Sequence, residues 1–537
     1  MKIGILSDSL IQSGFNGEVI NNILKCEDFE ISTIIVNNLP SKKKKFFMLF
    51  KKFSIIRILE KFLLVLIYKF ERFIYKKNFK KFKFHSINLD NLKSTKIVVT
   101  PNISKNNLFY YNKKDVEKLK SLNLDVVIRM CSGIIKGDIL NIAKFGIISY
   151  HHGDNNLYRG MPPGFWEVYN KEPSTGFIIQ KLNEELDNGE LLLKGFVTTK
   201  TFYYFNNLNI LKLSSKYIID VLNKIHKREK FREYRKKIYF NPLNKDPNLL
   251  NLFNYIFKIY SHIIFKKAEN IFFKKSWRVA FAKGNLFKKR LENYKIIKNN
   301  KNSFIADPFL WKYKDKNYLF VEEYDYIKNK AVISCYLLNN NNAEYIGVII
   351  EEDFHLSFPF IFQFNNNFYL CPETSKINEI RLYECVEFPL KWKYCKTILK
   401  NINAVDTILF EKDSIWWLLT NSRDDGMDPS NELNIFYSKD GPLTEKWISH
   451  KTNPIYIDIN NSRNGGIVYE DKKIYRVSQK PGFGHYGKEF NLNLIDEINE
   501  TTFKELNICT VKPNFFKNIN GTHHFNNNDE YCVIDFI

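Results

Sequence analysis

The C-terminal part of the chain, from about residue 301, contains an internal repeat that strongly constrains its fold. Each copy has an apolar strand, a tight turn of Asn, Asp or Lys, and a second strand rich in aromatic residues. The copies begin at Ile305, Ser357, Ala404, Asn464 and Gly521, roughly 40–60 residues apart. Four-stranded units at this period form the blades of a β-propeller. We therefore predict an all-β five-bladed propeller over 301–537; a β-sandwich with coincidental hairpins is the alternative.

The first 200 residues alternate short β-branched runs with stretches of helix length. The runs that read as strands are Lys2–Ser7, Ile31–Val36, Lys96–Thr100, Asp125–Arg129 and Gly146–Tyr150, and the expected helices are 17–25, 46–80, 114–122 and 134–143. This alternation predicts an α/β Rossmann-like, doubly wound parallel sheet with its ligands at the carboxyl ends of the strands. No Gly-x-Gly-x-x-Gly loop follows the first strand, so a dinucleotide cofactor is not expected.

With 537 residues the chain is too long for one ordinary domain. We predict an α/β domain over 1–200, a basic helical connector over 201–300 and the propeller over 301–537.

The net charge of +23 is concentrated in Ser41–Lys83 and Lys212–Lys275, where Lys and Arg alternate with apolar residues at helical spacing. This pattern suits an amphipathic helix on an anionic membrane surface and lacks nucleic-acid signatures. A Lys-rich composition imposed by an AT-rich genome is the alternative. Apolar runs are too short to span a membrane, and Asp8 interrupts the place of a signal-peptide core. The eight scattered cysteines indicate neither disulfides nor a metal site. We expect a cytoplasmic protein, peripheral at the inner face of a membrane.

The densest group of polar residues, Ser149–Trp166, directly follows a buried strand. His151 can act there as an acid or base, and Asp187, on a later loop, can orient it. Candidate substrate-binding residues in the same stretch are His152, Asp154, Asn155, Arg159 and Gly160. The alternative is that these residues have structural roles, in packing, in an ion pair or in shaping the loop.

The run YHHGDNNLYRGMPPGFW, the pair Thr175-Gly176 and the run LDNGELL resemble the formyltransferase family, which includes methionyl-tRNA and sugar N-formyltransferases. The resemblance implies catalytic roles for His151 and Asp187 and N10-formyltetrahydrofolate as formyl donor. Ser149 stands where the family has an Asn that holds the oxyanion, and loss of such a donor costs about 100- to 1000-fold in rate. A different donor is therefore the alternative.

In the propeller, the repeat places Asp307, Pro359, Asp406, Arg463 and His523 at roughly equivalent positions. Nearby candidates for ligand binding are Glu322, Glu323, His355, Glu373 and His524. Carboxylates, Arg and His gathered at a propeller axis suit a sugar or an acidic glycan. Alternatively, the Asp-Pro and Asn turns only close hairpins.

The opening IADPFL resembles the five-bladed, family 43-like glycoside hydrolases, and the passages HLSFP, LCPET, AVDTILF and GTHHF are similar to the propeller of glucosamine inositolphosphorylceramide transferases. Asp307 matches the hydrolase base, but the next two acids fall on Phe358 and Asp406. Binding or altered chemistry is therefore expected in place of ordinary hydrolysis.

Together these features predict a transferase of bacterial surface-polysaccharide or glycolipid biosynthesis that transfers a formyl or related group to a sugar. The partners expected are a sugar nucleotide, glycan or glycolipid. The alternatives are a glycosyltransferase-like enzyme that uses a sugar nucleotide, and a non-enzymatic glycan-binding protein whose catalytic domain has decayed.

Overall fold

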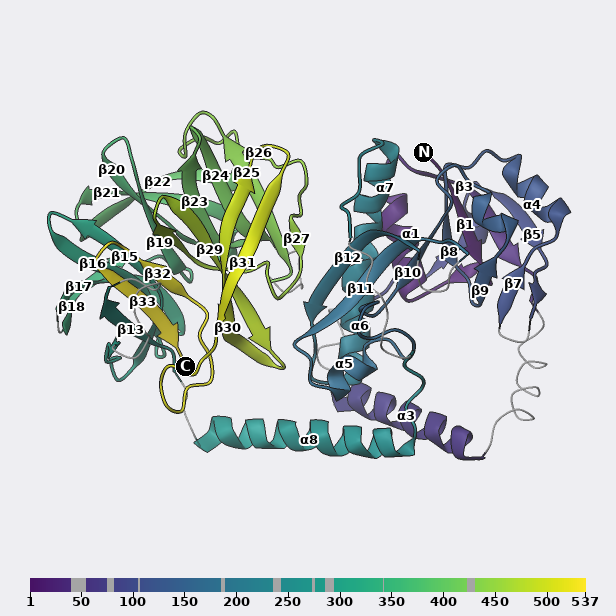
Figure 1. Cartoon of the computed structure of the whole chain (residues 1–537), viewed down its shortest axis with the longest axis horizontal. Coiled ribbons are helices and arrows are strands. Elements are labelled where there is room, and N and C mark those ends of the chain that lie inside the picture. The colour runs from purple at the N-terminus through teal and green to yellow at the C-terminus, as the bar shows by residue number, and fades with distance from the viewer. Residues whose placement is uncertain are drawn as a thin grey trace. The chain divides into compact units, whose positions relative to one another are not determined.

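The computed structural model describes residues 1–39, 55–74, 82–104, 107–184, 189–234, 243–272, 276–284, 294–340, 342–422 and 430–537. By their contacts these residues separate into two compact units, Met1–Phe265 and Lys266–Ile537 (Figure 1). The boundaries 1–200, 201–300 and 301–537 stay a prediction; within the expected connector, residues up to Phe265 belong to the first unit.

The first unit is built on a seven-stranded sheet in the order β12-β11-β10-β8-β1-β3-β5. Its strands are β1 (Lys2–Ser7), β3 (Glu30–Asn37), β5 (Thr95–Val99), β8 (Val126–Met130), β10 (Ile147–His151), β11 (Ser174–Lys181) and β12 (Glu190–Thr198). The strands from β5 to β10 are parallel, whereas β10–β11 and β11–β12 are antiparallel. The five strands predicted for the parallel sheet are parallel, and the antiparallel strands β11 and β12 make the sheet a mixed one. The chain passes from β11 to β12 through a short connection, and a parallel pair needs a crossover of a dozen or more residues.

The α-helices are α1 (Phe15–Leu24), α3 (Ile55–Ile74), α4 (Lys113–Lys120), α5 (Phe165–Tyr169), α6 (Tyr203–Ser214), α7 (Ile218–His226) and α8 (Leu249–Phe272), which runs past the end of the first unit; the short 3-10 helices are η2 (Leu89–Asn91), η3 (Asp138–Asn141) and η4 (Ser215–Tyr217). Small strands complete the unit: β2 (Ile11–Gln12) pairs with β4 (Ile87–Asn88), and β6 (Asn102–Ile103), β7 (Leu108–Tyr110) and β9 (Ile134–Lys136) form a second small sheet.

The expected helix over 134–143 is wrong, because its first residues form β9 and its later ones η3. Gly133 and Gly137 flank β9 with positive φ angles of 76° and 83°. Such left-handed positions suit glycine and interrupt a helix.

The described residues of the second unit form five antiparallel sheets. Four of them follow one another along the chain: β15 (Ser303–Tyr313), β16 (Lys316–Asp325), β17 (Lys330–Asn339) and β18 (Asn342–Ile350); β19 (Ser357–Phe364), β20 (Asn367–Glu373), β21 (Glu379–Glu387) and β22 (Lys391–Lys400), with η6 (Ser375–Ile377); β23 (Ala404–Lys412), β24 (Ile415–Ser422), β25 (Glu432–Ser438) and β26 (Ile448–Ser449), with β27 (Tyr456–Ile457) beside β25; and β28 (Asn464–Glu470), β29 (Lys473–Gly482), β30 (His485–Ile498) and β31 (Phe503–Val511).

The fifth sheet joins the two ends of the second unit. It contains β13 (Arg278–Lys283), β14 (Lys295–Ile296), β32 (Phe525–Asn527) and β33 (Tyr531–Phe536), and β13 pairs with β33 along its whole length. Each copy of the sequence repeat forms one antiparallel strand pair, namely β15–β16, β19–β20, β23–β24, β28–β29 and β32–β33. The strand pairs predicted from the repeat are therefore present in the structure.

Among the described residues, no helix has both the length and the apolar character needed to cross a membrane.

Candidate functional site

In the first unit, the ends of three neighbouring strands bring together Arg129 of β8, Ser149 of β10 and Gln180 of β11. Ser149 lies directly opposite Gln180 in the β10–β11 ladder. The Arg129 guanidinium donates a hydrogen bond from Nη1 to Ser149 Oγ at 3.1 Å and binds the carbonyl of Gly133. These side chains line a cavity of about 140 Å³ together with His151. The strand-end location predicted for the ligand site is thus occupied by polar side chains around a cavity.

His151 is the last residue of β10 and is partly buried at this cavity. Its proposed partner Asp187 lies outside the described residues. Asn183 and Gly189, the nearest cavity-lining residues on either side of Asp187 in the sequence, are both described. Sequence reasoning missed Arg129 and Gln180, because each sits inside a run that reads only as a buried strand.

His152 points away from this chemistry and packs inside the unit. Its ring stacks on Tyr150 with centroids 5.8 Å apart, meets Phe15 edge-on at 4.6 Å, and places Nε2 3.1 Å from Ser214 Oγ. Burial, with a smaller contribution from His151, lowers the pKa of His152 to about 3. The imidazole is therefore neutral at physiological pH, which fits the packing role of His152 better than substrate binding.

Asp154 and Asn155 hold the loop that follows β10. Lys194 of β12 donates to Asp154 Oδ1 at 2.6 Å and to Asn155 Oδ1 at 3.3 Å, and Asp154 Oδ1 also accepts the backbone N–H of Asn156. Both Asp154 and Asn155 are buried. These contacts explain why a polar pair follows the strand, and they anchor the loop to the edge of the sheet.

Gly160 and Arg159 meet a distant segment through their backbones. The carbonyl of Arg159 accepts the N–H of Asn244 at 2.8 Å, and the next N–H, of Met161, returns to the Asn244 carbonyl at 3.2 Å. Gly160 has a φ of 106°, and a Cβ there would lie 2.0 Å from the Asn244 carbonyl oxygen. Glycine is therefore required at this position by the backbone.

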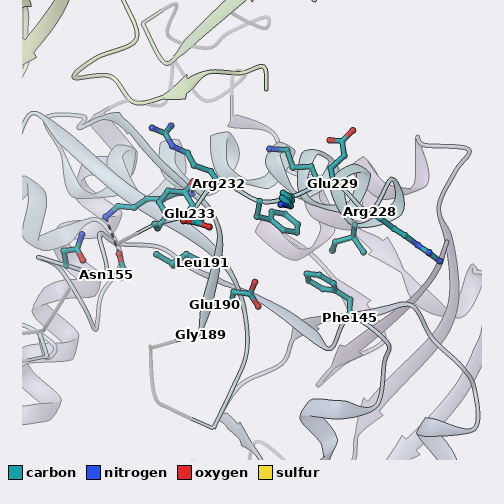
Figure 2. Close-up of a pocket in the computed structure, with 16 residues that line it drawn as sticks. Phe145, Asn155, Gly189, Glu190, Leu191, Arg228, Glu229, Arg232 and Glu233 are labelled. Atoms are coloured by element: carbon teal, nitrogen blue, oxygen red, sulfur yellow. Dashed lines mark hydrogen bonds between the residues drawn. The ribbon is translucent and has the colours of Figure 1, made fainter. Parts of the chain in front are cut away.

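A larger cavity of about 950 Å³ lies in the same unit and shares Gly189 with the smaller one (Figure 2). Five basic and three acidic side chains line it: Lys194, Lys224, Arg228, Lys230 and Arg232, with Glu190, Glu229 and Glu233. Its volume is typical of a small-molecule site, and its basic excess suits an anionic ligand. The lining residues between Lys224 and Tyr234 belong to the segment 212–275, for which the sequence predicts a membrane contact. Asn155 is the lining residue that the sequence predicts to bind substrate.

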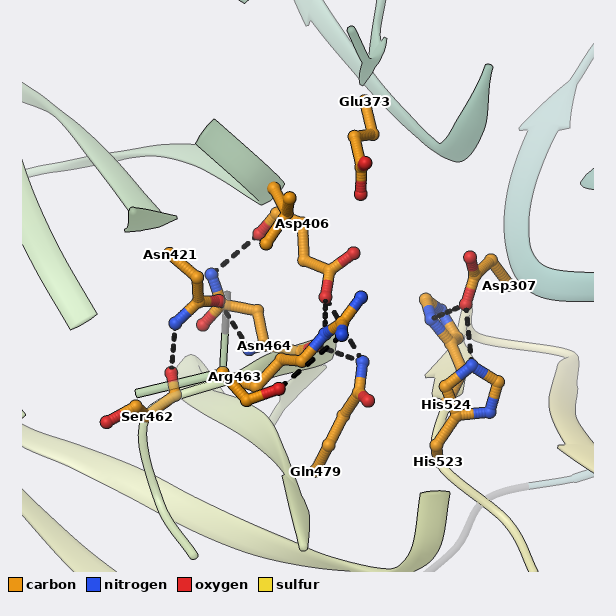
Figure 3. Close-up of polar contacts among 12 residues, drawn as sticks. Asp307, Glu373, Asp406, Asn421, Ser462, Arg463, Asn464, Gln479, His523 and His524 are labelled. Atoms are coloured by element: carbon orange, nitrogen blue, oxygen red, sulfur yellow. Dashed lines mark hydrogen bonds and ion pairs between the residues drawn. The ribbon is translucent and has the colours of Figure 1, made fainter. Parts of the chain in front are cut away.

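In the second unit, charged side chains from different sheets converge. Figure 3 shows the carboxylates of Asp307, Glu373 and Asp406, from β15, β20 and β23, directed toward a common region. Arg463, just before β28, and His523, just before β32, complete a set drawn from all five sheets. We call these five residues the central cluster.

The position of Asp307 in β15 is repeated in the neighbouring sheets by a local bulge. Asp307, Phe358 and Asp406 have φ angles of 49°, 48° and 50°, and each bulge falls at the same place in its strand pair. In the fourth sheet, the bulge lies between Asn464 and Ile467.

These bulges correct the alignment of the repeats. Phe358 is the equivalent of Asp307, in place of Pro359, and Gly465 holds that position in place of Arg463. Left-handed backbone is unusual for residues other than glycine, and such strain is concentrated at functional sites.

His523 bridges two buried carboxylates. Its Nε2 lies 3.3 Å from Asp307 Oδ1 and its Nδ1 lies 2.9 Å from Asp535 Oδ2, while His524 Nδ1 lies 3.5 Å from Asp307 Oδ1. Burial by itself would lower the pKa of His523, but the carboxylates of Asp535 and Asp307 outweigh it and raise the pKa to about 10. Single donor atoms of Asp307, His523 and Asp535 lie within 4.8 Å of one another. This spacing would also allow the three side chains to hold a metal ion.

Arg463 pairs with Asp406 through Nε, and Gln479 donates to the same carboxylate oxygen at 3.2 Å. The ring of Tyr486 lies 4.9 Å from the Arg463 guanidinium. Burial raises the pKa of Asp406 to about 7, although the Arg463 charge opposes this shift. The Arg–carboxylate pair and the aromatic ring beside it can bind a polar, ring-shaped ligand.

Glu322 and Glu323 are consecutive residues of β16, so their side chains point to opposite faces of the sheet. Glu323 accepts hydrogen bonds from the hydroxyls of Ser303 and Ser334 at 2.9 and 2.6 Å. Glu322 is buried, and its pKa is raised well above the usual range by burial and by Asp307 and Glu373. His355 places Nε2 3.5 Å from Glu322 Oε1. The predicted ligand residue Glu323 is therefore held by serines, and Glu322 adjoins the central cluster.

Comparison with known proteins gives two separate matches. Residues 291–530 match the family described as "Glucosamine inositolphosphorylceramide transferase 1, N-terminal". The protein of that name from Arabidopsis thaliana is 35% identical over 213 residues, which cover 38% of this chain and 27% of the relative. The methionyl-tRNA formyltransferase of Clostridioides difficile (strain 630) is 38% identical over 84 residues, covering 16% of this chain and 27% of the relative.

Among solved structures, a sugar N-formyltransferase from Shewanella sp FDAARGOS_354 is similar at 16% identity and a TM-score of 0.27, covering 48% of this chain and 88% of that one. A thermostable family-43 glycoside hydrolase is similar at 10% identity and a TM-score of 0.31, covering 40% and 81%. The chain spans about a quarter of the length of the two curated relatives named above. The N-terminal region is formyltransferase-like and the C-terminal region is similar to glucosamine inositolphosphorylceramide transferase 1, so both resemblances seen in the sequence are confirmed.

Proposed function

We propose that this chain is a transferase that adds a formyl or related group to a sugar, with the chemistry in the first unit and glycan binding in the second. The observation that carries the proposal is the cluster of Arg129, Ser149 and His151 around one strand-end cavity. It lies within a region similar to enzymes named formyltransferases, and the relatives matched by the second region are also named as transferases. We assign it to bacterial surface-polysaccharide or glycolipid synthesis at the cytoplasmic face of a membrane.

In this proposal His151 takes the proton from the acceptor amine or hydroxyl as the new bond to the acyl carbon forms, and returns it to the leaving group. The Ser149 hydroxyl accepts a hydrogen bond from Arg129 and donates one to the Tyr150 carbonyl at 3.4 Å; in this proposal it turns that proton to the developing oxyanion. A hydroxyl polarised by a guanidinium thus replaces the amide expected at this position.

N10-formyltetrahydrofolate would supply the one-carbon unit when bound. The cavity of about 140 Å³ has room for the reacting groups, and the larger cavity of about 950 Å³ has the volume and basic lining for an anionic body. The same lining supports the second candidate function, transfer from a sugar nucleotide, because diphosphate oxygens suit Arg228 and Arg232.

We further propose that the five sheets of the second unit are the blades of one propeller and that the central cluster binds the glycan. The pairing of β13 with β33 supports a closed ring, since it joins the beginning and end of the unit. The central cluster has three members in strands of three sheets and two just before strands of the other two, and their convergence supports a binding site at the ring's centre.

The test is a mass-spectrometric screen of the full chain with N10-formyltetrahydrofolate or labelled sugar nucleotides, and with amino sugars and nucleotide-linked amino sugars as acceptors. We expect one formyl group on an acceptor, lost in His151→Asn and retained in His226→Asn, an exposed histidine of the same unit. Turnover of a sugar nucleotide that depends on His151 would favour the second candidate. Retained transfer in His151→Asn would refute the assignment of the site.

A further inference from the structure

Helix α3 is oriented against the usual rule, with its acidic residues inward and its large apolar residues outward. Glu71 is fully buried and Glu60 nearly so, together with Ile67. By contrast Phe62 is 60% and Phe73 74% exposed. A surface helix of a globular protein normally buries its apolar stripe and exposes its charges.

Polar contacts fix this orientation. Glu71 accepts the backbone N–H of Tyr204 at 2.7 Å and the hydroxyl of Tyr255 at 2.6 Å, and Glu60 accepts the N–H of Leu249 at 3.3 Å. The ring of Tyr204 also meets the ring of Tyr68 edge-on at 4.5 Å. The helix is therefore anchored to α6 and to the first turns of α8, beside which it lies (Figure 1), and its outer face cannot turn inward without breaking these bonds.

The outer face is apolar along the whole helix. Its exposed apolar side chains are Ile55, Ile56, Ile58, Leu59, Phe62, Val65, Leu66, Phe70, Phe73 and Ile74. The neighbouring helix α8 adds an exposed stripe of Leu250, Phe253, Phe257 and Ile264 at helical spacing. Contiguous apolar surface of this extent is typical of a site that contacts a membrane or another protein.

The charges on this face have one sign. Lys61, Lys69 and Arg72 are exposed, and both acidic residues of described α3 are the buried glutamates. In α8, Lys258 is the one charged residue between 249 and 265. Two copies of such a face would bring like charges together, whereas an anionic surface would complement them.

We propose that the outer face of α3, with the exposed stripe of α8, binds the surface of an anionic lipid bilayer. The helix would lie in the plane of the interface, with its Phe, Leu and Ile side chains among the acyl chains and its Lys and Arg at the headgroups. The residues of this surface line neither cavity of the unit, so the surface would hold the enzyme near a lipid-linked substrate without taking part in the reaction.

The test is co-sedimentation of the full chain with vesicles of phosphatidylcholine alone or mixed with an equal amount of phosphatidylglycerol. We expect binding to the mixed vesicles only, weakened at about 1 M salt, where the screening length falls to about 3 Å. Replacing Lys61, Lys69 and Arg72 by Gln removes three charges, each of which contributes about fivefold near such a surface, so partition should fall roughly 100-fold.

A second variant tests the apolar part, with Phe62→Ser, Leu66→Ser and Phe73→Ser combined; it should also lose binding by about 100-fold or more. The matched control replaces Lys113, Lys114 and Lys118 of α4 by Gln, which removes three exposed charges elsewhere on the unit and should leave binding unchanged. Circular dichroism would verify that each variant is folded. Absence of vesicle binding at low salt, or undiminished binding by the α3 variants, would overturn the proposal. Concentration-dependent dimerisation abolished by the same substitutions would instead assign the face to a second copy.

Discussion

The Glu167 carboxyl is buried directly after the loop that follows β10, and its ionisation should couple the stability of the first unit to pH. It lies on α5 with 2% of its surface exposed, and its Oε1 has no hydrogen-bond partner among the described residues. Burial raises the pKa of Glu167 to about 8 from its usual 4.5, with smaller contributions from Asp154 and Glu172. The folded state therefore holds a proton that the unfolded state has already released.

Because the folded-state pKa is the higher one, the stability contribution is full below pH 4.5 and is lost as pH rises through 8. Between pH 5 and pH 8 the two pKa values imply a loss of about 3–4 kcal/mol, at about 1.4 kcal/mol per unit. Glu167→Gln keeps the shape of the side chain and removes its ionisation. The variant should therefore gain stability over the parent protein by this amount as pH rises from 5 to 8.

Urea unfolding at pH 5, 6.5 and 8, followed by hydrogen–deuterium exchange of peptides from residues 1–265, measures the stability of the first unit separately from that of the second. Glu117→Gln on α4 is the control, since that carboxyl is exposed and should give no pH-dependent difference. If Glu167→Gln changed the stability by the same amount at pH 5 and pH 8, burial would not govern the ionisation of this carboxyl.

Three further predictions follow from contacts described for the two units. Arg476 is fully buried and binds both carboxylate oxygens of Glu505 at 2.6 and 2.8 Å. Arg476→Met should therefore lower the free energy of unfolding of the second unit by about 3–5 kcal/mol in urea, because the Glu505 charge would be left without its partner. A loss under about 1 kcal/mol would contradict this. Gly160→Ala should lower the melting temperature clearly more than Gly14→Ala. Both glycines have positive φ, but only at Gly160 would the new Cβ collide with another backbone segment, at Asn244. Equal losses in melting temperature would argue against this collision. Arg129→Lys should lower kcat by about 100-fold with little change in KM in the transfer assay, and an unchanged kcat would exclude a role for the guanidinium in stabilising charge.

Features set by local periodicity could be predicted from the sequence. The strand Lys2–Ser7 is found at its predicted bounds, and each of the five repeats forms its expected strand pair. Such features depend on residues close in the chain, where alternation of apolar side chains is sufficient evidence.

Features set by distant neighbours could not be predicted. The left-handed backbone of Phe358 depends on a bulge shared with other sheets, and Phe alone gives no sign of it. The apolar periodicity of α3 was recognised, but the inward turn of Glu71 depends on the N–H of Tyr204 and the hydroxyl of Tyr255. Arg129 reads as part of a strand until β10 places Ser149 beside it.

The fifth sheet of the second unit has a consequence for the order in which the protein is made. Ala282 of β13 pairs with Cys532 of β33, 250 positions later. During synthesis the four intervening sheets can form one after another as their residues leave the ribosome, but β13 has only the two-residue strand β14 beside it until β33 has emerged. Closing a loop of that length in an unfolded chain would cost about 5 kcal/mol of entropy. The preceding sheets, once folded, bring the ends together in advance, and the nascent chain must keep one apolar strand from aggregating until then.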